Sequence, residues 1–258
     1  MTTIDKVNNR PYLLDTTAQQ ITFLDFRFYR TEDGSFVPSV TTILEAYPKG
    51  AAFYEWLKKN GEESDAIRDE AGRRGSAVHD FTERYDNGEE VSLLDIDGNI
   101  QCKLGEWAMF ERYVEFRNRF PFEIIHNEAR IASPKLGFAG TIDRVINLNG
   151  QNVLVDIKTS AYVWPSYWLQ LAAYEQLITE SYGYNPIERV AILHLNAKTR
   201  TEGKAGTIQG KGWQLIFRTE EETEKDWQLF KATHQLWLAE NGGMKPKETS
   251  YRLVHKYQ

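Results

Sequence analysis

The sequence predicts an α/β protein in which a central sheet is flanked by helices and preceded by a mostly helical N-terminal part. Three features predict this class: helical apolar spacing before residue 120, the turn pair Asn149-Gly150 between two apolar runs, and a helix and a strand after that turn. Helices first, then a short meander of strands, a helix and a further strand are an order typical of a sheet covered by helices.

The N-terminal part begins with strand-like sequence and continues with helices. Runs of β-branched and aromatic residues bounded by turn residues predict strands, and apolar residues three and four apart after a capping residue predict helices. The helix over residues 62–85 is either one long helix or two that break near Gly72 to Gly75. In chain order the predicted elements are strands 21–29 and 35–37, a short helix capped by Ser39, and helices 51–59, 62–85 and 103–119.

The remainder of the chain is predicted to form the core of the fold. One domain is expected over residues 1–258, with a mostly helical part over 1–120 and the core over 121–258. In chain order the predicted core elements are strand 123–132, the two hairpin strands around Asn149-Gly150, helix 165–182, strands 187–196 and 213–217, and helix 220–240.

The Asn149-Gly150 turn determines which side chains face each other across the hairpin. Both residues tolerate the positive φ of a type I′ turn, which would pair Leu148 with Gln151. Counting back along both strands then places Asp143 directly opposite Asp156. Like charges in this position destabilise a sheet, so the pair requires a cation between its members.

The residues around the acidic pair indicate its chemistry. The other face of the hairpin is mostly apolar and is expected to be buried, with Arg144 as the exception. Lys158 shares the acidic face, about 6.6 Å beyond Asp156. Paired aspartates suit a hard divalent ion, and an adjacent ammonium suits phosphate charge. The pattern therefore predicts either a metal-and-phosphate site or a structural cluster in which Lys158 alone offsets the carboxylates.

With Asp143 as the first acid and Asp156-Ile157-Lys158 as a D-x-K element, the chain resembles the PD-(D/E)XK nuclease superfamily. Its RecB-like exonuclease branch is similar in two further elements, a later Gln170-x-x-x-Tyr174 helix and an upstream helix with His79. Residues 37–41 also resemble the mitochondrial genome maintenance exonuclease and phage exonucleases. The resemblance implies a restriction-endonuclease-like core with a central mixed sheet.

The same resemblance implies roles for individual residues. Asp143, Asp156 and Lys158 would be catalytic, and one or two Mg2+ or Mn2+ ions would be held by Asp143, Asp156, His79 and the Ile157 carbonyl. Taken alone, His79 is also readable as an ordinary packed or surface histidine. The candidates for substrate contact are Gln170, Tyr174, Glu128, Arg74 and Arg144.

Each candidate for substrate contact has a structural alternative. Gln170 and Tyr174 share one helical face, and they either reach the edge of the active site or satisfy each other within the core. Glu128 is either an extra acid near the metal or a carboxylate on an edge strand. The basic residues form either a local groove for nucleic acid or solvated surface charge; they are Arg68, Arg73, Arg74, Arg144, Lys158, Lys198, Arg200, Lys204 and Lys211.

Aromatic residues at the start of the predicted helix 165–182 raise a similar choice. Trp164, Tyr167 and Trp168 either stack unpaired bases, which is a sequence-tolerant contact, or belong to the hydrophobic core.

The expected function is a metal-dependent DNA exonuclease, a deoxyribonuclease that hydrolyses phosphodiester bonds with metal-activated water. The expected substrate is DNA with a free end or single-stranded DNA, with a recombination or replication protein as a further partner, in phage biology or DNA repair. The alternatives are a structure-specific or single-strand endonuclease of the same fold, and a catalytically silent module that binds nucleic acid or a partner.

The composition excludes several classes of protein. The 31 basic and 37 acidic residues give a net charge of −6, which argues against a protein that coats nucleic acid by bulk attraction. The single cysteine, Cys102, excludes an intrachain disulfide and a four-thiolate cluster. A long apolar run and an N-terminal signal pattern are both missing, so a cytoplasmic protein without a membrane partner is expected.

Overall fold

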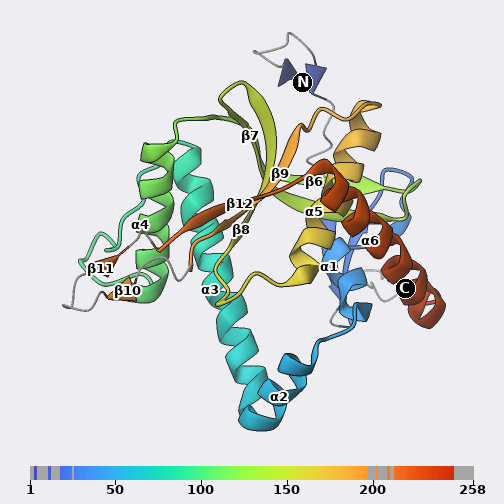
Figure 1. The fold of residues 1–258 in the computed structure, drawn as a ribbon, viewed down its shortest axis with the longest axis horizontal. Helices are drawn as coiled ribbons and strands as arrows, with labels where there is room; N and C mark the ends of the chain where they lie inside the picture. The colour runs from blue at the N-terminus through green and yellow to red at the C-terminus, as the bar shows by residue number, and fades with distance from the viewer. Residues whose placement is uncertain are drawn as a thin grey trace, which may run out of the picture.

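A five-stranded sheet with the strand order β12-β9-β8-β7-β6 runs through the middle of the molecule (Figure 1). Neighbouring strands are antiparallel, except that β8 and β9 are parallel. The sheet is therefore mixed, which confirms the predicted fold class. Its strands are β6 (Glu123–Ser133), β7 (Phe138–Leu148), β8 (Gln151–Lys158), β9 (Arg189–His194) and β12 (Gln214–Arg218).

The computed structural model describes residues 18–24, 26–196 and 212–246. It also gives the backbone of four short strands, β1 (Thr3–Ile4), β2 (Pro11–Tyr12), β10 (Thr201–Glu202) and β11 (Ile208–Gln209). Among the described residues, no helix combines the length and apolar character needed to cross a bilayer. The candidate groove residues outside the described part of the chain are Lys198, Arg200, Lys204 and Lys211.

The hairpin between β7 and β8 has the register that the sequence predicts. Leu148 pairs with Gln151, and the two turn residues, Asn149 and Gly150, have φ values of 54° and 84°. Positive φ at both central residues is the type I′ geometry, whose twist matches that of the flanking strands.

Helices cover both faces of the sheet (Figure 1). Helices α3 (Glu63–Asp86) and α4 (Leu104–Arg119) lie on one face. The other face is covered by α5 (Pro165–Tyr182) and α6 (Glu220–Asn241), together with the short α1 (Val40–Ile43).

This arrangement corrects the expectation that only one face of the hairpin is buried. Val145 and Leu154 belong to the cluster under α5 and α6, whereas Val153 and Val155 belong to the cluster under α3 and α4. A strand covered by helices on both sides reads as a nearly continuous apolar run, because both sets of alternating side chains are buried.

The N-terminal part contains a small sheet beside the helices. The predicted strand 21–29 is in fact two strands, because the chain turns at Leu24, which has a φ of 49°. Ser39 caps α1 as predicted, with its hydroxyl accepting a hydrogen bond from the Thr42 N–H. The remaining N-terminal elements are β3 (Gln19–Phe23), β4 (Phe26–Arg30), β5 (Phe36–Pro38), the 3-10 turn Leu44–Ala46 and α2 (Ala51–Asn60).

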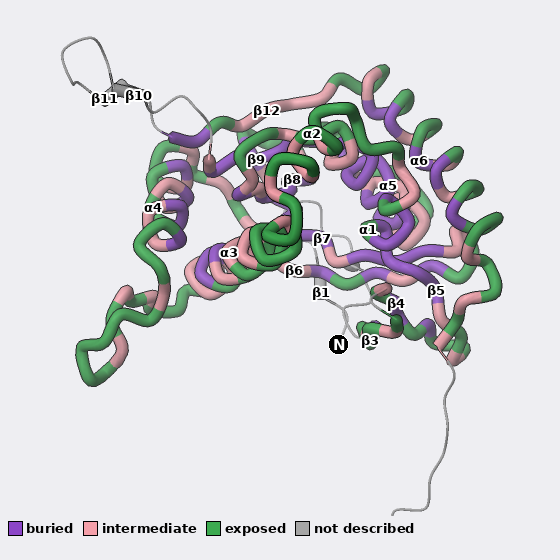
Figure 2. The backbone as a smooth tube through the Cα atoms, turned by 90° about the horizontal axis from the view of Figure 1, so that it is seen from below, coloured by how far each residue is buried: buried purple, intermediate pink, exposed green. Residues whose placement is uncertain are grey.

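Helix α2 and the first half of α3 project from the body of the molecule (Figure 1). Helix α2 has no buried residue, and the buried residues of α3 are all in its second half, at Val78, Phe81 and Thr82 (Figure 2). Helix α3 is continuous through Gly72 and Gly75, so the one-helix alternative is correct. Its second half carries His79 to the sheet.

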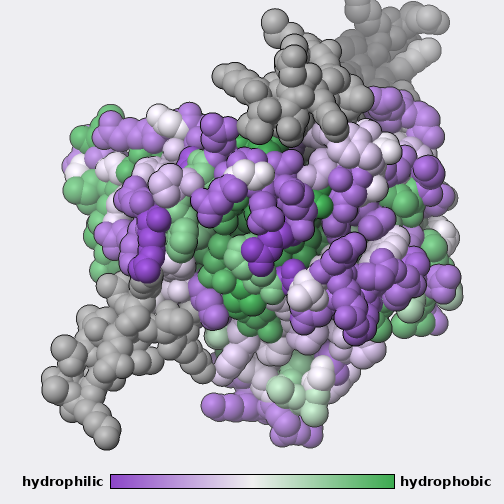
Figure 3. Space-filling view, turned by 45° about the horizontal axis from the view of Figure 1, so that its top comes forward, coloured by the Kyte–Doolittle hydropathy of each residue, from purple (hydrophilic) through white to green (hydrophobic). Residues whose placement is uncertain are grey.

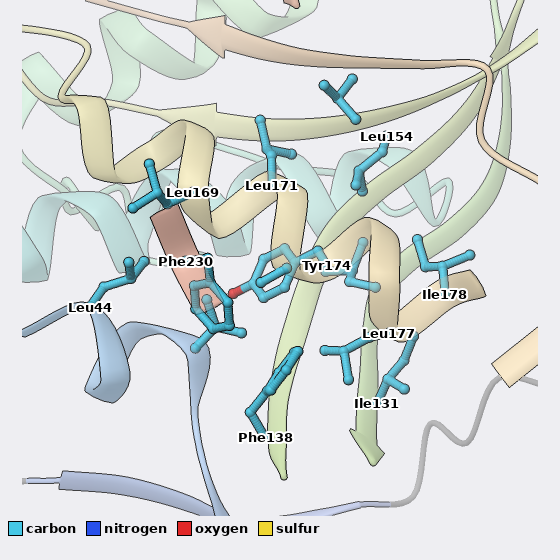
Figure 4. Packing of buried hydrophobic residues seen from close by; sticks show 14 of the residues in the cluster. Leu44, Ile131, Phe138, Leu154, Leu169, Leu171, Tyr174, Leu177, Ile178 and Phe230 are labelled. Carbon is cyan, nitrogen blue, oxygen red and sulfur yellow. The ribbon is translucent and has the colours of Figure 1, made fainter. Parts of the chain in front are cut away.

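Gly140 on β7 allows α5 to pack closely against the sheet. The Tyr174 ring lies among the buried side chains between α5 and the strands (Figure 4). A Cβ atom at position 140 would overlap the edge of this ring. The missing side chain therefore creates the space that Tyr174 fills.

We expect Gly140→Ala to destabilise the protein by about 1 to 3 kcal/mol, because an added methyl group must displace the ring or the strand. Urea unfolding measures this cost, and the penalty should shrink in a Tyr174→Ala background, where the overlap is gone. Gly72→Ala is the matched control, since nothing lies within 4 Å of the added Cβ on α3. A penalty that is equal in both backgrounds would disprove the packing argument.

Candidate active site

Carboxylates occupy the same level on three neighbouring strands. The pairs on either side of Glu128, Asn127 with Arg144 and Ala129 with Ile142, place Glu128 opposite Asp143. The β7–β8 ladder, continued one step beyond Arg144 and Val155, places Asp143 opposite Asp156. Three acids in a row repel one another, and the rest of the site supplies the opposite charge.

His79 lies against the first two of these acids. Its Nδ1 is 3.6 Å from Glu128 Oε1 and 3.6 Å from Asp143 Oδ1, and its Nε2 is 3.1 Å from the Ile157 carbonyl oxygen. Ligand atoms of His79, Glu128 and Asp143 all lie within 4.8 Å of one another. An imidazole and two carboxylates at this spacing are a donor set that could hold a divalent metal ion.

Local geometry sets the position of both acids. Glu128 has a φ of 48°, a left-handed conformation that costs a non-glycine residue about 1 to 3 kcal/mol and concentrates at functional sites. Asp143 is 8% exposed, and its Oδ2 accepts a hydrogen bond of 2.7 Å from the Ile157 N–H. That bond crosses the hairpin and fixes the orientation of the carboxylate.

Asp156 is engaged by a lysine and an amide. Lys158 Nζ lies 2.7 Å from Asp156 Oδ2, and Gln170 Nε2 donates to Asp156 Oδ1 at 3.3 Å. Gln170 also accepts from Lys158 at 3.2 Å and donates to the Tyr174 hydroxyl at 3.0 Å. Helix α5 therefore holds the acid and the lysine of the D-x-K element in one hydrogen-bonded group.

Burial and charge shift the pKa values of the site in opposite directions. Burial raises the pKa of Asp156 to about 6, although Lys158 acts to lower it. Burial acts to lower the pKa of His79, but Asp143 and Glu128 outweigh this effect and raise it to about 9. Burial likewise opposes the charge of Lys158, and Asp156 and Asp143 raise its pKa above the usual range. At neutral pH the acidic row is thus flanked by two cations.

The expectation that Arg144 contacts the substrate is wrong, because its side chain is buried. It is 1% exposed and pairs with Asp86 at 2.7 Å and with Glu128 at 3.2 Å. The guanidinium also donates to the Asp143 carbonyl at 2.7 Å and to the Thr82 hydroxyl at 3.1 Å. Arg144 therefore ties the end of α3 to the strands that carry the acids.

Asp86, the partner of Arg144, was not among the residues that the sequence pointed to. Its side chain is fully buried and accepts a hydrogen bond from Tyr113 of α4. The signal lay in the spacing of His79, Thr82 and Asp86, three and four residues apart, which places all three on one side of α3.

The basic candidates differ in how far they are already paired. Arg68 pairs with Asp65, and Arg73 pairs with Glu70 and Glu106. Arg74 is partly buried, and among the described residues its Nε has no hydrogen-bond partner. Arg74 thus remains a candidate for an anionic ligand.

The chain belongs to the PD-(D/E)XK nuclease superfamily, whose sequence model matches residues 42–249. Among solved structures, an alkaline exonuclease (LHK-Exo) from Laribacter hongkongensis is similar at 11% identity and a TM-score of 0.35, over 80% of this chain and 89% of that chain. LHK-Exo in complex with dAMP is similar at 12% identity and a TM-score of 0.36, over the same shares. No curated protein sequence matches.

We expect Arg144→Met and Asp86→Leu each to cost about 1 to 3 kcal/mol of stability, because each change removes the nearest partner of a buried charge. Asp86 would keep Arg117 at 3.3 Å, and Arg144 would keep Glu128 at 3.2 Å. The double variant should cost at least about 1 kcal/mol less than the sum, since it removes both charges. Urea unfolding of the four proteins measures the difference. Strictly additive costs would show that the two residues do not act as a pair.

Proposed function

We propose that the chain is a metal-dependent deoxyribonuclease of the RecB-like branch, and that it acts as an exonuclease. Membership in the superfamily makes it a nuclease, and nucleases of this superfamily use divalent metal ions. The observation that carries the proposal is the convergence of His79, Glu128 and Asp143 beside the Asp156-Lys158 pair. DNA as the substrate agrees with the similar alkaline exonuclease in complex with dAMP.

The residues of the site divide into two groups. His79, Glu128 and Asp143 would hold an ion, with Asp156 and the Ile157 carbonyl next to them, so Glu128 is proposed as a metal ligand instead of a substrate contact. A bound Mg2+ or Mn2+ ion supplies Lewis acidity for the phosphate and lowers the pKa of a water molecule.

The second group acts on the phosphate. The Lys158 ammonium stabilises charge that develops on the phosphate oxygens. We propose a catalytic role for no other cationic side chain. Gln170 positions Lys158 through its amide oxygen, and Tyr174 in turn fixes the amide of Gln170. Arg74, on the neighbouring α3, is proposed to contact a backbone phosphate of the substrate.

Two observations favour this proposal over a structural ion-pair cluster. Lys158 alone cannot offset the acidic row, because His79 lies against Glu128 and Asp143 on the other side of the row from the Asp156-Lys158 contact. The backbone at Glu128 is left-handed, a strained conformation that concentrates at functional sites, and it places a third carboxylate in the row, where the Glu128 side chain also contacts Arg144 and His79.

We expect Asp143→Asn to lower both Mn2+ binding and DNA cleavage, the latter by at least about a hundredfold. Asparagine keeps an oxygen for the Ile157 N–H and removes the charge. Lys158→Ala should lower cleavage similarly but retain the ion, which separates the two roles. Calorimetric Mn2+ titration and the digestion of end-labelled linear DNA measure the effects, with Glu111→Gln on the exposed side of α4 as the control.

The same assay separates an exonuclease from an endonuclease of the same fold. Linear DNA with free ends should be degraded, whereas covalently closed circular single and double strands should remain intact. Cleavage of the circles would replace the exonuclease proposal with the endonuclease alternative. If the protein binds Mn2+ but cuts none of these DNA molecules, the result would favour the catalytically silent binding module.

We expect Mn2+ affinity to rise about tenfold per pH unit between about pH 7 and pH 8. His79 has a pKa of about 9 because Asp143 and Glu128 outweigh its burial, so it is protonated in this range and must lose the proton to bind an ion. Calorimetry in buffers of different ionisation enthalpy counts the proton released. His79→Gln should abolish both the slope and the release, whereas retention of the release would exclude His79 as its source.

A further inference from the structure

Two aromatic side chains stand exposed in the loop between β8 and α5, directly after Lys158. Tyr162 is 55% exposed and Trp164 is 42% exposed. Their rings meet edge to face, with centroids 5.9 Å apart. The surface has other apolar areas, and Figure 3 shows one gathered between hydrophilic side chains. The Tyr162-Trp164 pair differs from such an apolar area in its position, because it lies in the loop that follows Lys158, the proposed catalytic lysine.

The other aromatic residues at the start of α5 have different roles. Trp168 is 7% exposed and belongs to the core, with Arg218 lying over its ring at 4.4 Å. Tyr167 lies under Lys158, whose Nζ is 4.4 Å from the ring centroid. Trp168 is therefore a core residue, Tyr167 packs against the core and contacts the lysine, and Trp164 is exposed to solvent.

Hydrogen bonds hold the loop in place. The Ser160 hydroxyl donates to the Tyr162 carbonyl at 2.7 Å, and His194 Nε2 lies 2.7 Å from the Ser160 carbonyl oxygen. The Tyr167 N–H donates to the Trp164 carbonyl at 3.0 Å, where Pro165 begins the helix. A ligand that contacts the two rings therefore loses little free energy to ordering of the loop.

Helix α3, which carries Arg74, lies beside the start of the loop. Helix α3 approaches it closely, since a Cβ atom on Gly75 would be 3.6 Å from Thr159 Oγ1. Arg74 is the residue before Gly75 on this helix, and its Nε has no hydrogen-bond partner among the described residues. Exposed π faces in a loop that follows Lys158 and contacts α3 match the chemistry of a single nucleic-acid strand, which alternates flat bases with phosphates.

We propose that Tyr162 and Trp164 form a stacking platform for an unpaired base of the DNA strand whose phosphate reaches Lys158. This inference rests on the proposed nuclease function and adds a preference for a single-stranded segment next to the cleavage site. Stacking reads no particular base, because every base has a π face, so the platform confers strand selectivity without sequence selectivity.

The test measures binding in the cleavage-deficient Asp143→Asn protein by fluorescence anisotropy. The ligands are an intact oligothymidine strand and a set of strands that each carry one abasic position near an end. Trp164→Ala should weaken binding of the intact strand about 5- to 150-fold. One abasic position should weaken binding of the parent protein to a similar extent, and at that position Trp164→Ala should have no further effect. Trp164→Phe should largely restore affinity.

Three comparisons keep the test independent of folding and of the proposed function. Tyr184→Ala, at a residue 41% exposed beyond the other end of α5, should leave affinity unchanged. Trp164→Ala should not change the slope of log Kd against log salt, whereas Arg74→Ala should reduce it, because only the latter removes a phosphate contact. Full affinity of Trp164→Ala for the intact strand, or equal losses on intact and abasic strands, would overturn the platform. Absence of DNA binding by the parent protein would instead overturn the proposed function.

Discussion

The structure depends on the placement of Glu128, Asp143 and Asp156 at one level of the sheet. The register of two antiparallel ladders forces these carboxylates together, and cations are needed on each side to make the arrangement tolerable. His79 comes from α3, and Lys158 from the end of β8. Arg144 supplies a third positive charge from within the protein, where it pairs with Glu128 and Asp86. The site is therefore built as much from the offsetting charges as from the acids.

The two helical layers deliver these offsetting groups from opposite faces of the sheet. Helix α3 brings His79 and anchors itself through the contacts of Thr82 and Asp86 with Arg144. Helix α5 brings Gln170 and Tyr174, and Gly140 lets it come close enough for the Gln170 amide to reach both Asp156 and Lys158. Because each helix is held by its own buried cluster, the positions of the charged side chains are set by packing and not by the charges alone.

Much of the hairpin and of its acidic pair could be predicted, because local sequence signals determine their geometry. The Asn149-Gly150 turn fixes the β7–β8 register, and with it the opposition of Asp143 and Asp156. The role of Glu128 could not be derived in the same way, since it depends on the β6–β7 register and on a left-handed φ at a glutamate, which no sequence pattern signals. The burial of Arg144 was missed because the partner that makes it possible, Asp86, is 58 residues away in the chain. A charge on an apolar face indicates a buried ion pair only when its partner can be found.

The balance of charges also bears on how the proposed enzyme would attract an anionic substrate once an ion is present. With the three acids ionised, His79, Lys158 and Arg144 bring the sum of charges in the site close to zero. Because His79 is protonated below about pH 9, a divalent ion that displaces the proton of His79 replaces one positive charge with two. The site then carries about one unit of net positive charge in a partly buried setting, where Coulomb interactions are stronger than in water. A phosphate is attracted to that excess, so in the proposed enzyme the ion and the substrate bind more favourably together than either does alone.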